Sequence, residues 1–174
     1  MPLRNGPHGY GAVTKTLHWL TVPAIAAQFV VGYTMEADDS GRGRGRGRSG
    51  ESGRGRGRGG DDDDLFTGGF DLLDLHVVLG LAILALALLR VLWRSTTPLP
   101  PWDPSLTATQ QRLVHATEVC LLSLLFVVPL TGLALVLGDD DLLAIHIAAH
   151  VAFFVALAAH LTMVLGKRLL PRML

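Results

Sequence analysis

Four long apolar runs constrain this chain more than any other feature. They cover residues 17–35, 75–93, 116–137 and 142–165. A helix needs about 20 apolar residues to cross the hydrocarbon core of a bilayer, and each run is about that long. The runs lack the apolar–polar alternation of barrel strands, and only helices and closed barrels satisfy their backbone in lipid. The sequence therefore predicts an all-α fold, an integral membrane four-helix bundle made by one domain over residues 1–174.

The connections between the runs differ in composition. Residues 36–64 hold Gly-Arg repeats followed by four aspartates, a low-complexity sequence that cannot pack a core, so we expect a disordered loop. Residues 94–112 are rich in proline. Only four residues, 138–141, separate the last two runs, which predicts that the third and fourth helices are antiparallel neighbours. The first run is too long for a signal peptide, and no small-x-small cleavage site follows it.

Basic residues bear on the orientation in the membrane. Four spans put both termini and residues 94–112 on one side, which carries eight basic residues against seven on the other. All seven lie in the Gly-Arg repeat, where acidic neighbours offset them, although acidic residues count little in the positive-inside rule. We place both termini in the cytoplasm of a bacterial inner membrane. Trp19 and Trp93 then lie at the same interface, as an aromatic belt requires.

Histidines occur inside the apolar runs at two depths. His18 near the start of the first helix and His160 near the end of the fourth share the cytoplasmic level. His76 and His146 share the outer level. His146 and His160 are 14 residues apart, which leaves them about 40° apart around the helix and roughly 21 Å apart along it. One helix therefore offers an imidazole at each of two levels.

The paired histidines point to haem. Ionisable residues within a membrane are costly and usually functional. Two axial imidazoles per level in a helix bundle match b-type haem, whereas a tetrahedral zinc site needs four ligands at one level. The chain has one cysteine and no C-x-x-C-H sequence, so the haem would be non-covalent. We predict two haem b groups, held by His18/His160 and His76/His146, with Gly32 leaving room for the outer macrocycle.

Further polar residues lie near these levels. His150, one turn from His146, is an alternative outer ligand, and its depth makes it the less favoured of the two. Arg90 at the inner level is a candidate contact for a haem propionate or a quinone head, with snorkelling to the interface as the equal alternative. His115 and Glu118, one turn apart, are a candidate quinone or proton site, and interfacial solvation is the simpler explanation.

The sequence resembles the prokaryotic cytochrome b561 family, which includes cytochrome b subunits of hydrogenases. The matching segments are "YGAVTKTLHWL", "LDLHVVLGLAILALALLRVLWRSTTPLPP", "LLFVVPLTGLAL" and the fourth-helix histidine pair followed by "LLPRML". The resemblance implies four helices, two non-covalent b haems and electron exchange with quinone. By position it assigns the same two histidine pairs. The chain departs from the family pattern in the Gly-Arg repeat and in Glu118, which stands where a histidine is frequent.

These observations predict a membrane cytochrome that takes electrons from quinol and passes them to an acceptor outside, either superoxide or a redox protein. A cytochrome b subunit that anchors a dehydrogenase or hydrogenase is the first alternative. The second is a metal transporter that uses membrane histidines and binds no haem. Gly-Arg repeats also bind RNA, but their expected place outside the cytoplasm argues against a nucleic-acid partner. The sequence leaves open whether the protein forms a homodimer, and it assigns no catalytic residue.

Overall fold

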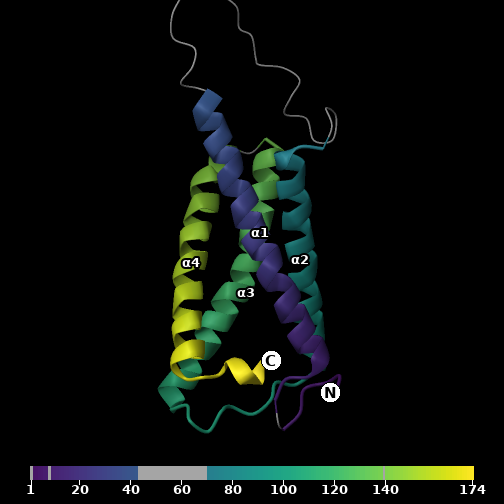
Figure 1. Cartoon of the computed structure of the whole chain (residues 1–174), viewed down its shortest axis with the longest axis vertical. Coiled ribbons are helices and arrows are strands. Elements are labelled where there is room, and N and C mark those ends of the chain that lie inside the picture. The colour runs from purple at the N-terminus through teal and green to yellow at the C-terminus, as the bar shows by residue number, and fades with distance from the viewer. Residues whose placement is uncertain (1, 8, 43–69, 139) are drawn as a thin grey trace, which may run out of the picture.

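The computed structural model describes residues 2–7, 9–42, 70–138 and 140–174, and within these ranges it is all-helical (Figure 1). The elements in order are α1 (Ala12–Arg42), α2 (Leu72–Thr96), α3 (Ala108–Val136), the 3₁₀ turn η1 (Asp140–Leu142), α4 (Leu143–Gly166) and the 3₁₀ turn η2 (Leu170–Arg172). The described ranges contain no strand. The predicted four-helix bundle is therefore confirmed. The helix α1 continues into the predicted loop as far as Arg42, and residues 43–64 lie outside the described part.

In the part of the chain that the structure describes, three helices are long and apolar enough to cross a membrane. The most apolar stretches of α2, α3 and α4 have mean hydropathies of 2.5, 2.6 and 2.0. Their outward faces carry exposed apolar side chains, such as Leu92 at 58% and Val155 at 66% exposure, which lipid would cover. The helix α1 is longer but less apolar, because His18, Pro23 and Gln28 interrupt it. Its crossing of the membrane stays a prediction.

Side-chain caps determine where α2 and α3 begin. The Asp71 carboxylate accepts a hydrogen bond from the backbone N–H of Asp74, at 2.9 Å, and the Asp74 carboxylate accepts one from the N–H of Asp71. Thr107 and Gln110 make the same reciprocal pair at the start of α3. Each pair satisfies backbone donors that a helix start leaves free, which stabilises a helix by about 1 kcal/mol. Both helices therefore start several residues before their apolar runs.

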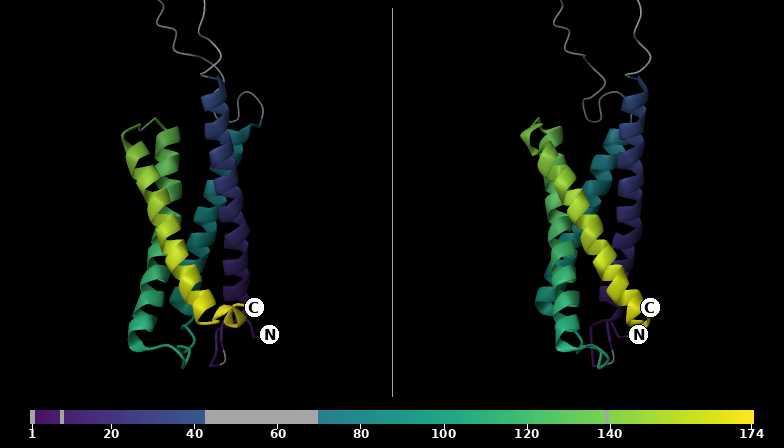
Figure 2. Two further views of the ribbon diagram at one scale, coloured as in Figure 1. Left: turned by 60° about the vertical axis from the view of Figure 1, so that its left-hand side comes forward. Right: turned by 90° about the vertical axis from the view of Figure 1, so that its left-hand side faces the viewer.

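The helices pack in the order of the chain. The helix α1 contacts α2, α2 contacts α3, and α3 contacts α4, so the predicted neighbourhood of α3 and α4 is confirmed. A buried cluster of Ile83, Ala87, Leu125 and Phe153 joins α2, α3 and α4. Both termini lie at one end of the elongated bundle in every view (Figure 2). Which face of the membrane this end occupies stays a prediction.

The segment after α4 runs beneath the bundle at this end (Figure 1). Its carbonyl at Met173 accepts a hydrogen bond from Nε1 of Trp19 on α1, at 2.7 Å. The Arg172 guanidinium donates to the Pro101 carbonyl at 2.6 Å and lies 3.8 Å from the Asp103 carboxylate. The N-terminal arm joins the same loop through Asn5. These bonds hold the C-terminal segment and the 97–106 loop together.

Asp103 makes this loop sensitive to acid. The side chain and then the backbone N–H of Ser105 donate to its carboxylate, at 2.7 and 2.9 Å, and with Arg172 they lower the pKa of Asp103 below 3.8. A carboxyl whose pKa is depressed by folding stabilises the fold above its unfolded pKa, and that stabilisation is lost as the pH falls through the folded pKa. We expect the Ser105 amide resonance to shift as the pH falls through the lowered pKa of Asp103. In Asp103→Asn the shift should vanish, and its persistence would contradict this role.

Candidate functional site

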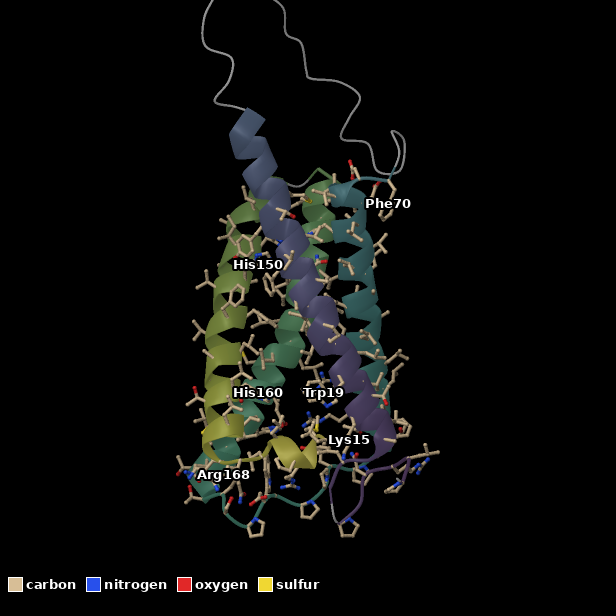
Figure 3. All side chains as sticks on the ribbon, in the orientation of Figure 1. Lys15, Trp19, Phe70, His150, His160 and Arg168 are labelled. Atoms are coloured by element: carbon tan, nitrogen blue, oxygen red, sulfur yellow. The ribbon has the colours of Figure 1, made fainter. Side chains whose placement is uncertain are left out.

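A pocket of about 230 Å³ lies between the helices near the end that holds both termini. His18 of α1 and His160 of α4 both line it. Figure 3 shows His160 and Trp19, the neighbour of His18, at a similar height in the bundle, with His150 much farther from the termini. The helix α1 packs on α2 and α4 packs on α3, so the two imidazoles reach the pocket from different helix pairs. The structure thus brings the predicted inner pair to one pocket.

The rest of the pocket wall is apolar toward the bundle centre and charged toward the termini. The apolar wall is formed by Val22, Ile25, Leu121, Leu125, Phe153 and Leu157. Arg90 and Arg94 of α2 and Glu118 of α3 lie on the wall as well. A haem needs flat apolar contact for its ring, two axial nitrogen donors and cations for its propionates. The residues of this pocket fit such a group.

Two residues that the sequence analysis paired differ in their relation to the pocket. Glu118 lines it, within electrostatic reach of Arg94, His115 and Arg90. His115 is exposed and does not line it. Helical periodicity alone could not decide between them, because it gives their separation but not the rotation of the helix.

Sequence reasoning missed several residues of the pocket. Arg94 is four residues after Arg90 and therefore shares its helix face, a signal that was available in the sequence. Tyr10 and Arg172 reach the pocket from the N-terminal arm and the C-terminal segment, and nothing in the sequence links them to it. Burial, and after it Glu118, raises the pKa of Tyr10, so its hydroxyl stays protonated at neutral pH.

The imidazole rings of His76 and His146 at the outer level each contact a glycine of a neighbouring helix. The ring of His76 lies against Gly32 of α1, where a Cβ atom would be 3.0 Å from Cε1 of the imidazole. The ring of His146 lies against Gly132 of α3, with the same 3.0 Å approach. Glycine permits this contact because it has no side chain. The space beside Gly32, expected to admit a macrocycle, is occupied by the His76 ring.

A third histidine, His150, lies at the outer level. The ring of His150 lies 4.4 Å from that of His146 and 5.3 Å from that of Phe29, between centroids. His76 lies within electrostatic reach of both histidines. Nε2 of His76 is 3.1 Å from Nε2 of Gln28, whereas its buried Nδ1 has no hydrogen-bond partner among the residues described. An orphaned nitrogen in a buried site calls for an explanation, and a cofactor that reorients the imidazole supplies one.

Other metal arrangements have no counterpart in the described ranges. These contain no group of three or more His, Cys, Asp or Glu side chains placed to hold a metal ion.

The sequence model of the prokaryotic cytochrome b561 family matches residues 9–174. The chain belongs to the prokaryotic cytochrome b561 family. A comparison with curated proteins gives no match, and neither does a comparison with solved structures. As a member of the cytochrome b561 family, the protein is a multi-pass membrane b-type cytochrome that binds haem b and transfers electrons.

Proposed function

We propose that this cytochrome b561 family member holds two haem b groups and carries electrons between quinol and an acceptor on the opposite face of the membrane. His18 and His160 would ligate the haem nearer the termini, and His76 and His146 the other. The observation that carries the proposal is the pocket shared by His18 and His160, with its apolar wall and paired arginines. Haem with two axial imidazoles supplies one-electron transfer rather than oxygen binding.

In this proposal Arg90 and Arg94 would bind the haem propionates. Arg90 and Arg94 are one turn apart on α2 and both reach the pocket. Propionates carry negative charge into a region of low dielectric, where charge-assisted bonds to guanidinium groups offset the loss of hydration. The pair would thereby fix the orientation of the haem between His18 and His160.

Glu118 is the proposed proton acceptor for quinol. Oxidation of a quinol releases two protons with its two electrons, so the site needs a group to receive them. Glu118, Arg90, Arg94 and Tyr10 of the N-terminal arm all line the pocket. A carboxylate within hydrogen-bond reach of a substrate hydroxyl is a suitable general base. His115, exposed on the same helix, would exchange the proton with solvent.

The remaining assignments follow from the sequence. We place the pocket end in the cytoplasm of a bacterial inner membrane, because the basic residues outside the Gly-Arg repeat gather at that end. The acceptor at the opposite face would be a small oxidant such as superoxide or a redox protein.

Haem stoichiometry tests the proposal directly. The purified protein, produced with ample iron, should show sharp b-type bands in its reduced-minus-oxidised spectrum and contain two haems per chain. One haem per chain would contradict the two-site arrangement, and a folded colourless protein would contradict the function. Quinol should reduce both haems in the isolated chain. A dihaem protein that quinol cannot reduce would instead favour a subunit anchoring a dehydrogenase or hydrogenase.

A further inference from the structure

The outer level offers two histidines of α4 for one ligand position. His146 and His150 are one turn apart, both half-buried, with their rings 4.4 Å apart between centroids. Depth along the helix favours His146, but depth does not explain why His150 would not ligate the iron instead. Their surroundings, however, differ in their contacts with α3.

The hydroxyl of Thr131 touches three groups. Its Oγ1 lies 2.8 Å from the carbonyl oxygen of Val127 and 3.0 Å from that of Val128. It also lies 2.9 Å from Nδ1 of His146. A threonine within a helix commonly donates its one hydroxyl proton to a preceding carbonyl. Its lone pairs are then left to accept, so Nδ1 of His146 must be the donor.

The proton on Nδ1 of His146 decides where the lone pair of the ring lies. In a neutral imidazole with its proton on Nδ1, the lone pair is on Nε2. This is the tautomer that a metal ligand requires, and such ligands nearly always donate the other ring N–H to a fixed acceptor.

The neighbouring glycine fixes the position of the ring. A Cβ atom at residue 132 would lie 3.0 Å from Cε1 of His146, so any larger residue would displace the imidazole. His150 lacks an equivalent support. Its ring packs edge-on against Phe29, and within the described residues no hydrogen bond reaches it.

Given the proposed dihaem function, we propose that Thr131 is a positioning residue that selects His146 over His150 as the outer axial ligand. The threonine hydroxyl holds the Nδ1-protonated tautomer and so leaves the lone pair of the ring on Nε2. By accepting the Nδ1–H bond it also makes the imidazole a stronger donor to iron, which favours the ferric state.

The test compares Thr131→Val, Thr131→Ser and Thr34→Val in the full-length protein, by redox titration of both haems. Loss of the hydroxyl should favour the ferrous state and raise the potential of one haem. Outer-shell partners of metal ligands contribute about 10- to 100-fold. We expect the low end, about tenfold, because the Gly132 contact that positions the ring remains. Tenfold corresponds to about 59 mV for a one-electron couple. Thr131→Ser should keep the wild-type potential.

Thr34 is the matched control. Its hydroxyl bonds the carbonyls of Val30 and Val31 at 2.9 and 2.8 Å, the same pattern on α1, and among the described residues it bonds no histidine. Thr34→Val should leave both potentials unchanged, and the second haem of Thr131→Val serves as an internal check on folding. Equal potentials in Thr131→Val and wild type would overturn the inference while leaving the proposed function intact. So would loss of the outer haem in His150→Leu. A wild-type protein without haem would overturn both.

Discussion

Replacing His160 by leucine should leave one haem per chain. His160 lines the pocket with His18, whereas His150 of the outer level lies much farther from the termini (Figure 3). Leucine fills a similar space but offers no lone pair, so the inner haem should be lost and the outer one retained. Haem content per folded chain, measured from the reduced spectrum and protein concentration, should fall by half.

The pairing of His160 with His18 can be tested by combining changes. If both ligate one haem, His18→Leu, His160→Leu and the double variant should all keep one haem, because residues that act as a unit are not additive. His150→Leu places the same substitution on the same helix and should keep two. A folded double variant without any haem, or either single variant with two, would show that the pairing is wrong.

Glu118→Gln should lower the rate of haem reduction by quinol at least a hundredfold. Glutamine keeps the shape of glutamate but cannot accept a proton, and general-base catalysis typically contributes 10²–10⁴-fold. Glu118 lines the pocket without being a haem ligand in our proposal, so both haems should remain. Stopped-flow reduction by quinol, with dithionite reduction as the measure of haem integrity, gives the two quantities separately.

Asp103→Asn is the control for this carboxyl-to-amide change. Asp103 lies in the loop before α3, where it pairs with Ser105 and Arg172 rather than lining the pocket. Its replacement should leave the quinol rate within about twofold of wild type, since surface substitutions are usually small in effect. A Glu118→Gln protein with an unchanged rate would remove this carboxylate from the proton path and leave it an electrostatic partner of the arginines.

The depth of each histidine could be read from the sequence because helix rise is uniform. His18 and His160 were assigned to one level by counting along their helices, and the structure places both on one pocket. The same counting put His76 and His146 at the other level, where they lie within electrostatic reach. Counting residues could not separate Glu118 from His115, one of which lines the pocket while the other is exposed.

The depth of a residue in a membrane helix can be read from the sequence but the rotation of the helix cannot, and the reason is physical. In a soluble helix the apolar stripe shows which face turns inward, but in lipid the outward face is apolar as well. Hydropathy therefore determined the number and order of these helices and the levels of their histidines, and left the rotation of each helix undetermined. Only the packed bundle decided that Tyr10 and Arg172 reach the pocket, that His76 rests on Gly32, and that Thr131 meets His146. Such contacts join residues of different helices, and the distances between helices are set by packing rather than by local sequence.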